Sequence, residues 1–176
     1  MKHYEFQKTF RELYDKAVAL YAKGQREPET LLTANEQAFL AANGLTAQNI
    51  YDYAEDHNNY GEPGCDLALG IETARRNYFL SVQHGKLSST VIDPNQMPAK
   101  TDSVRGISWL PRIIPKTKAK LRGELPSSLM YCCGGDRNFL KTHDINPVEF
   151  IDVVRQNETN DTAIIDWVEK RIKSAS

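Results

Sequence analysis

Apolar side chains recur at helical spacing over residues 4–23, with charged residues such as Lys8 and Glu12 between them. The apolar stripe consists of Phe6, Phe10, Leu13, Tyr14, Ala17, Leu20 and Tyr21. Gly24 and Pro28 follow. Because glycine commonly ends a helix and proline cannot continue one, the pattern predicts a helix that stops near residue 23.

Three more helices are predicted before residue 85, each from a cap and a following apolar stripe. The first begins at Thr33 and ends at Gly44. The second begins at Thr46 and ends in the turn-forming cluster 56–61. The third begins at Asp66 and ends at His84, before Gly85. Thr33 and Glu36 have the spacing of a capping box, in which each side chain binds a backbone N–H of the other residue. The N-terminal half is therefore expected to be helical throughout.

The helical period is lost between residues 86 and 104, where Ser, Pro, Asp and Asn cluster. This break predicts a helical domain over 1–85, a connector over 86–104 and a second helical domain over 105–176. The β-branched runs are too short to build a sheet. The chain is therefore predicted to be all-α, with two packed helical subdomains and about seven or eight helices in total.

The elements of the second domain are less regular. Residues 105–122 have a helical pattern that contains two prolines, so the helix either begins near Pro111 or is kinked. Residues 125–135 are predicted to be irregular or a short strand. The three following helices are expected to begin at Asp136, at Asn146 with Pro147 in the first position, and at Thr159 or Asn160.

The composition is that of an ordinary globular protein. The 176 residues include 22 Lys and Arg against 23 Asp and Glu, giving a net charge of -1, and 40% of residues are apolar. These values exclude a charge-driven disordered chain and a fibrous protein. No apolar run suits a membrane span or a signal peptide. Three cysteines, two of them adjacent, favour a reducing compartment, so we expect a cytoplasmic protein.

The adjacent pair Cys132 and Cys133 is the first candidate for chemistry, because it directly precedes a predicted helix start. A thiolate is stabilised near a helix N-terminus, which produces nucleophiles and redox sensors. His143 is a candidate base for such a thiol. The alternative is that both cysteines are small buried residues in a tight turn, which is the commoner role of a free cysteine.

A basic run follows Trp109 and is the second candidate. It comprises Arg112, Lys116, Lys118, Lys120 and Arg122, which would form a positive helix able to hold a small anion. The candidate ligand-binding residues are Arg112, Lys116, Lys118, Tyr131 and Asp136. The alternative is an ordinary solvated helix face. Because the whole chain is not basic, nucleic acid is not favoured as the partner.

Two further clusters suggest structure rather than chemistry. Asp52, Glu55, Asp56 and His57 are spread around a helix end instead of converging, so no metal site is predicted. Arg75 and Arg76 lie in an apolar helix, and we expect one of them to point toward the core with a carboxylate partner from Glu62, Asp66 or Glu72. No phosphate-binding glycine loop or nucleophile elbow occurs, and no cofactor is predicted.

The segment Gly106–Pro126 and the residues after it resemble a family of small bacterial proteins catalogued only as a domain of unknown function. The residues that carry the resemblance are Arg112, Lys116, Lys118, Tyr131, Cys132 or Cys133, Asp136, Phe139, Leu140 and Trp167. The resemblance covers about residues 105–173. It departs at Pro115 and Lys118, where the family pattern has Asp and Arg. It implies a helical fold and cytoplasmic residence, and it implies no activity. The first half looks like a helical partner domain of similar bacterial proteins.

Three functional hypotheses follow from these features. The first is a non-enzymatic binding or interaction module for a small anionic ligand or a protein partner. The second is an enzyme that uses the thiol of Cys132 or Cys133. The third is a nucleic-acid accessory protein that uses residues 112–122. The sequence contains no complete catalytic constellation, which favours the first hypothesis; it says nothing of the oligomeric state.

Overall fold

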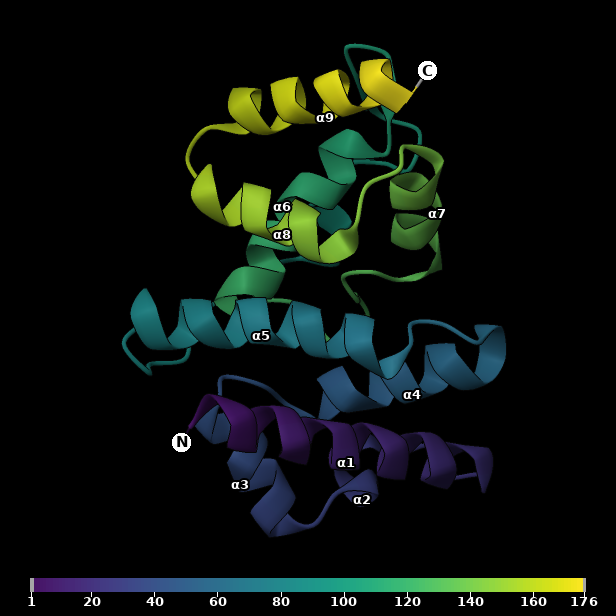
Figure 1. Cartoon of the computed structure of the whole chain (residues 1–176), viewed down its shortest axis with the longest axis vertical. Coiled ribbons are helices and arrows are strands. Elements are labelled where there is room, and N and C mark those ends of the chain that lie inside the picture. The colour runs from purple at the N-terminus through teal and green to yellow at the C-terminus, as the bar shows by residue number, and fades with distance from the viewer. Residues whose placement is uncertain (1, 176) are drawn as a thin grey trace. The chain divides into compact units, whose positions relative to one another are not determined.

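The computed structural model describes residues 2–175 and is predominantly α-helical, which confirms the all-α prediction (Figure 1). The chain divides into two compact units, Met1–Leu87 and Ser88–Ser176. Among the described residues no helix is both long enough and apolar enough to cross a lipid bilayer.

The first unit contains five helices among its described residues. They are α1 (His3–Ala22), α2 (Pro28–Leu31), α3 (Ala34–Ala42), α4 (Ala47–Tyr60) and α5 (Cys65–Ser81). Helix α1 packs against α2, α4 and α5. Phe6, Phe10 and Ala17 of its predicted stripe are fully buried in this core. The short helix α2 has no counterpart among the predicted elements; it starts at Pro28, which suits the first turn of a helix.

The predicted caps of α3 and α4 are present. The Thr33 hydroxyl accepts a hydrogen bond from the Glu36 N–H at 3.4 Å, and the Glu36 carboxylate accepts one from the Thr33 N–H at 2.6 Å. Thr46 caps α4 in the same way with Asn49. The prediction that this helix ends within residues 56–61 is confirmed, because α4 continues to Tyr60 and stops at Gly61, where φ is 74°.

Both arginines of α5 are buried, whereas the sequence predicted one. Arg75 donates to the Gln83 side-chain oxygen at 2.7 Å, and Arg76 donates to the Asn43 side-chain oxygen at 2.6 Å. Helix α5 also ends at Ser81, three residues before the predicted position. The guanidinium groups thus lie within the packing of the first unit.

The second unit contains a small hairpin and four α-helices among its described residues. Its elements are η1 (Pro94–Gln96), β1 (Ser103–Val104), β2 (Ile107–Ser108), α6 (Leu110–Arg122), α7 (Gly134–Thr142), α8 (Pro147–Gln156) and α9 (Asp161–Ala175). The strands are antiparallel, with Ser103 opposite Ser108 and Val104 opposite Ile107. Helix α6 is central, since it packs against α8, α9 and β1.

Helix α6 begins beside Pro111, which is one of the two predicted alternatives, and it continues through Pro115. The segment before the hairpin is attached to the end of α6. The Ile92 N–H donates to the Glu124 carbonyl at 2.9 Å, and the Ser88 hydroxyl donates to the Glu124 carboxylate at 2.8 Å. These contacts place residues 88–98 in the second unit.

The predicted caps of the last three helices were right in two cases and wrong in one. The Asn146 side chain accepts from the Val148 N–H at 2.8 Å, and that of Asn160 accepts from the Ala163 N–H at 3.1 Å. Helix α7, however, begins at Gly134 with Cys133 as its N-cap, and Asp136 lies inside its first turn. The Asp136 carboxylate instead binds groups outside α7, as described below.

Candidate functional site

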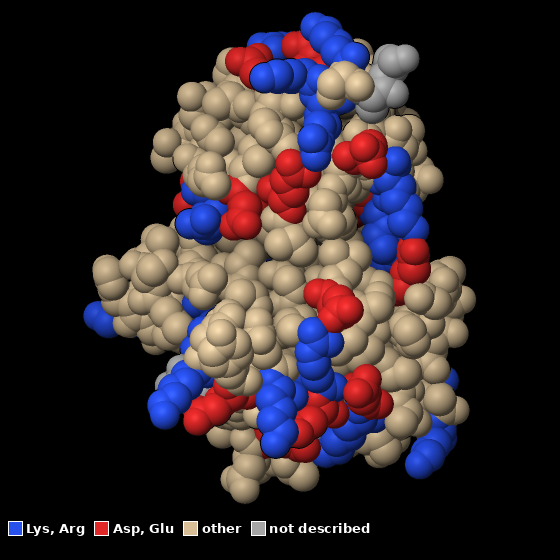
Figure 2. All heavy atoms as spheres, in the orientation of Figure 1, with Lys and Arg blue, Asp and Glu red and all other residues tan. Residues whose placement is uncertain are grey.

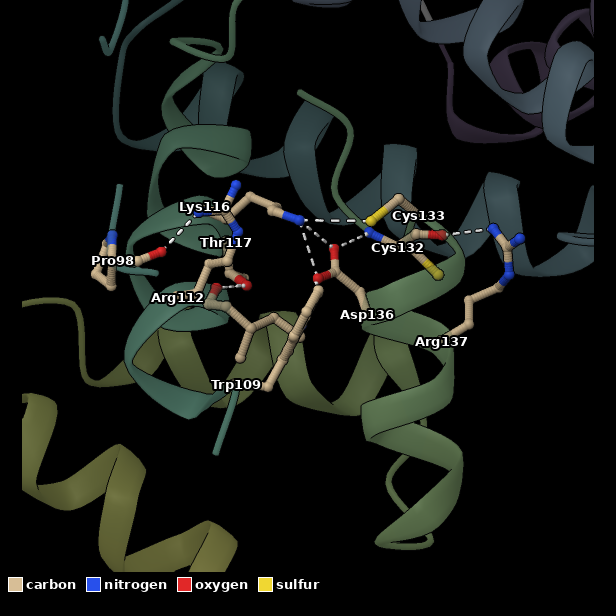
Figure 3. Close-up of polar contacts among 10 residues, drawn as sticks. Pro98, Trp109, Arg112, Lys116, Thr117, Cys132, Cys133, Asp136 and Arg137 are labelled. Atoms are coloured by element: carbon tan, nitrogen blue, oxygen red, sulfur yellow. Dashed lines mark hydrogen bonds and ion pairs between the residues drawn. The ribbon is translucent and has the colours of Figure 1, made fainter. Parts of the chain in front are cut away.

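A buried ion pair joins α6 to α7 in the second unit. The Lys116 ammonium lies 3.0 Å from each carboxylate oxygen of Asp136 (Figure 3). The Lys116 side chain is 2% exposed and that of Asp136 is 0% exposed. Removing two charges from water is costly unless they are paired and hydrogen bonded, so this pair holds the two helices in one arrangement.

Lys116 is buried because of its position on α6. Ile113, Lys116 and Lys120 are separated by three and four residues, so they share one helix face, and all three are buried. The basic run is therefore not a uniformly solvated face, which was the structural alternative considered for it. A cationic residue at core spacing requires an anionic partner, and Asp136 supplies it.

The Asp136 carboxylate receives two further hydrogen bonds. The Trp109 indole N–H donates to one oxygen at 2.9 Å, and the Cys132 backbone N–H donates to the other at 3.0 Å. With the two contacts from Lys116, both oxygens are well supplied with donors. Asp136 is thus fixed by groups from α6, from the residue before α6 and from the turn before α7.

Trp109 reaches this position because of two local features. It has a φ of 71° directly before α6, which turns the indole toward α7. Gly135 then provides the space for the ring, since a Cβ at that position would lie 2.5 Å from Trp109 Cζ2. The absence of a side chain at Gly135 therefore allows the indole to reach Asp136.

The two adjacent cysteines have different environments. Cys132 is fully buried, with a φ of 67°, and its carbonyl accepts a hydrogen bond from Arg137 at 2.7 Å. Cys133 is partly exposed, and its sulfur lies 3.5 Å from the Lys116 ammonium (Figure 3). The predicted alternative of two buried small residues therefore describes Cys132 and does not describe Cys133.

His143 does not lie beside either cysteine. It is the C-cap of α7, whereas Cys133 is the N-cap, so ten residue steps, about 15 Å along the helix axis, separate them. The His143 ring packs edge-on against Phe139 with 4.9 Å between ring centroids, and burial lowers the pKa of its imidazole. The structure thus does not place His143 where a base for Cys133 would lie.

Of the five predicted ligand-binding residues, Lys116 and Asp136 are in direct contact. Arg112 donates to the Pro98 carbonyl at 2.6 Å and extends away from the ion pair (Figure 3). Lys118 forms an ion pair with Asp161. The Tyr131 hydroxyl donates to the Pro147 carbonyl at 2.7 Å, and complete burial raises its pKa well above the usual value.

Sequence reasoning missed the part played by Trp109, which it noted only as a neighbour of the basic run. The sequence does contain a signal for the burial of Lys116, because Lys116 follows the apolar Ile113 by three residues and therefore lies on the same helix face. This helical spacing could not identify the Trp109 indole as a donor to Asp136, because that hydrogen bond joins residues 27 positions apart.

In the cluster 52–57 of the first unit, Glu55 and His57 contact nearby tyrosine hydroxyls. Glu55 accepts from the Tyr21 hydroxyl at 3.1 Å and from the Tyr51 hydroxyl at 3.3 Å, and the His57 ring lies 3.1 Å from the Tyr14 hydroxyl. Among residues 2–175 no three His, Cys, Asp or Glu side chains are grouped so as to hold a metal ion.

Charges of both signs are interspersed on the face shown in Figure 2, over each of the two units. Several cations of the second unit pair with nearby carboxylates. Arg122 lies 2.7 Å from Glu158, and Arg171 lies 2.6 Å from Glu149. This face therefore presents mixed charge rather than a single-sign field of the kind that attracts nucleic acid.

Comparison with known protein families finds a match within the second unit. Residues 96–176 match the family described as a domain of unknown function (DUF5069). This match confirms the resemblance found in the sequence, and the DUF5069 region contains the whole site from Trp109 to His143. No curated protein and no solved structure matches the chain. The family description carries no activity.

Proposed function

We propose that the DUF5069 region acts through the thiol of Cys133, which serves as a nucleophile toward a small electrophilic substrate. The observation that carries the proposal is the distance of 3.5 Å between the Cys133 sulfur and the Lys116 ammonium. A thiolate is the reactive form of cysteine, and a neighbouring ammonium favours that form.

The electrostatic balance around the sulfur supports this role. Lys116 is paired with Asp136, but the Trp109 and Cys132 N–H groups also donate to that carboxylate. The Asp136 carboxylate is thus fixed by several donors, and it holds the Lys116 ammonium beside the Cys133 sulfur. Cys133 is also the N-cap of α7, where the helix dipole favours negative charge.

The other two thiols are in less favourable positions. Cys132 is 0% exposed. Cys65 is partly exposed, but burial raises the pKa of its thiol, and the nearby Arg11 guanidinium only partly opposes that effect. Cys65 and Cys133 both combine access to solvent with a neighbouring cation, but burial disfavours the thiolate of Cys65, and we expect Cys133 to be the most reactive of the three.

The test is the rate at which iodoacetamide alkylates each cysteine of the native full-length chain at neutral pH, resolved by peptide mass spectrometry. We expect Cys133 to react first, and we expect Lys116→Met to slow its alkylation, because the ammonium 3.5 Å from the sulfur is removed. Lys116→Arg retains the charge and is the matched control. Cys133 reacting no faster than in the urea-unfolded chain would contradict the proposal.

A module that binds a small anion without covalent chemistry is the second candidate. It rests on Arg112, which lies one helical turn before Lys116 in α6 and whose guanidinium donates to the Pro98 carbonyl on the side away from the ion pair. Thermal-shift measurements with phosphate and with small carboxylates test it. We expect a stabilising shift that Arg112→Ala removes and Cys133→Ser does not, so the two candidates give different results with the same variants.

A further inference from the structure

The contact between Cys133 and Lys116 joins two groups that can react with each other. We propose that Cys133, once oxidised by a hydroperoxide, forms a sulfur–nitrogen bond with the Lys116 amine, so that α6 and α7 become covalently linked in a reversible oxidation response. This inference rests on the proposed reactivity of Cys133, and it adds the class of oxidant and the residue that captures the oxidised sulfur.

The first step is oxidation of the thiol. The Cys133 sulfur attacks the outer oxygen of the hydroperoxide, the sulfur–oxygen bond forms as the oxygen–oxygen bond breaks, and the thiol proton passes to the departing alkoxide or hydroxide. The sulfur is oxidised by two electrons to a sulfenic acid, and the hydroperoxide is reduced to an alcohol or water. The partial exposure of Cys133 gives a small peroxide access to the sulfur.

The second step is condensation and involves no further oxidant. The Lys116 ammonium loses a proton to Asp136, whose two oxygens each lie 3.0 Å from it. The free amine then attacks the sulfenic sulfur, the sulfur–nitrogen bond forms, and the hydroxyl group leaves as water with a proton from the nitrogen. Sulfenic acids are known to condense with nitrogen groups in this way.

The surroundings of Asp136 allow Lys116 to leave it. The Trp109 indole and the Cys132 backbone N–H continue to donate to the carboxyl group when the amine moves toward the sulfur. The buried pair also ends without net charge, since a neutral sulfenamide and a protonated carboxyl replace an ammonium and a carboxylate. The reaction therefore leaves no uncompensated charge in the interior.

The competing partner for an oxidised Cys133 is its neighbour Cys132. A disulfide between adjacent residues closes a strained ring, and the Cys132 carbonyl and N–H are both held by hydrogen bonds to other residues. Lys116 is on a separate helix and is already in contact with the sulfur. The geometry therefore favours the lysine as the group that captures the sulfur.

The experiment treats the native full-length chain with limiting hydrogen peroxide and analyses non-reduced peptides by mass spectrometry. We expect a linked pair of peptides, one containing Lys116 and the other Cys133, with the combined mass lowered by two hydrogens. A thiol reductant should separate them and restore both residues. Cys132→Ala should still form the link, because the buried thiol takes no part in it.

Lys116→Arg is the decisive variant, because it retains a cation for Asp136 but lacks the amine. We expect it to accumulate the sulfenic acid, trapped by a cyclic 1,3-diketone, without any linked peptides; circular dichroism verifies that it is folded. Loss of two hydrogens within the Cys132–Cys133 peptide alone would overturn the inference in favour of a disulfide or a backbone sulfenamide.

Failure of this inference is distinguishable from failure of the proposed function. If Cys133 is alkylated rapidly and yields a trapped sulfenic acid in the unsubstituted chain but no link to Lys116, only the inference is overturned. If Cys133 is neither alkylated nor oxidised faster than in the unfolded chain, both are overturned.

Discussion

Asp136 is the residue on which the arrangement of the site depends, because its carboxylate binds Lys116, Trp109 and Cys132 at the same time. The sequence predicted this residue as a helix cap and as a ligand-binding group. The structure instead uses it as the anion that compensates a buried lysine. A single carboxylate therefore positions the ammonium next to Cys133.

Replacing Asp136 with asparagine should destabilise the protein strongly. The substitution keeps the size of the side chain but removes its charge, so it leaves the Lys116 ammonium buried without an anion. We expect the free energy of unfolding to fall by ~3–5 kcal/mol, as is typical when one partner of a buried pair is removed. Urea denaturation followed by circular dichroism measures it.

Asp161→Asn is the matched control, because it removes the partner of Lys118 in a pair whose carboxylate side chain is 56% exposed. Such pairs contribute about 0–1 kcal/mol. Equal effects of the two substitutions would show that the Asp136 pair contributes no more than a surface pair.

At the scale of the element, the first turn of α7 packs directly against the Trp109 ring. The turn Cys132–Gly135 leads into the helix, and the Trp109 ring occupies the position that a Cβ of Gly135 would take. Glycine at this position is a packing requirement. The neighbouring Gly134 has no such restriction, since a Cβ there would meet only the Arg137 Nη2 atom at 3.8 Å.

Gly135→Ala should therefore be destabilising and Gly134→Ala should not. The added methyl group of the first variant would overlap the indole, and we expect a loss of ~1–3 kcal/mol through overpacking. In the second variant, alanine limits the unfolded chain more than glycine does, and we expect no loss or a gain of ~0.4–1 kcal/mol. Denaturation midpoints of the pair compare the two, and a larger loss for Gly134→Ala would refute this explanation.

At the scale of the whole molecule, the family match lies within the second unit. The DUF5069 match begins at residue 96, and the second unit begins at Ser88. The difference has a structural reason, since Ser88 and Ile92 both donate to Glu124 at the end of α6. The irregular segment before the family region is thus part of the same compact unit.

Alkaline pH should destabilise the folded chain through two phenols, one on the buried Tyr14 and one on the half-buried Tyr51. Burial raises the pKa of Tyr14 and of Tyr51 to about 12, whereas a tyrosine in the unfolded chain ionises near pH ~10. The folded state therefore retains these protons when the unfolded state has lost them. Their contribution to stability is complete below pH ~10 and is lost as the pH rises to about 12.

Urea denaturation between these pH values measures the effect. We expect the free energy of unfolding to fall by up to ~1.4 kcal/mol per pH unit for the proton on Tyr14, and we expect Tyr14→Phe to reduce that slope. Tyr60→Phe, which removes a phenol that is 71% exposed, is the control. A slope that is unchanged by Tyr14→Phe would contradict the assignment.

Local patterns in the sequence were sufficient to predict most helices and several caps. Thr33, Thr46 and Asn146 cap helices as predicted, because a cap depends on residues two or three positions apart. The stripe of α1 likewise reports its buried face. Where the prediction failed, at the start of α7, the Asp136 carboxylate binds Lys116 and Trp109, which lie outside the local pattern.

The site itself was decided by tertiary structure. The sequence by itself determined that Lys116 lies in a basic helix and that Cys133 precedes a helix. Only the packing of α6 against α7 decided that Asp136 compensates the lysine, that Cys133 rather than Cys132 is accessible, and that His143 lies at the far end of α7. The physical reason is that burial of a charge selects a partner through space, and periodicity along the chain contains no information about which distant residue provides it.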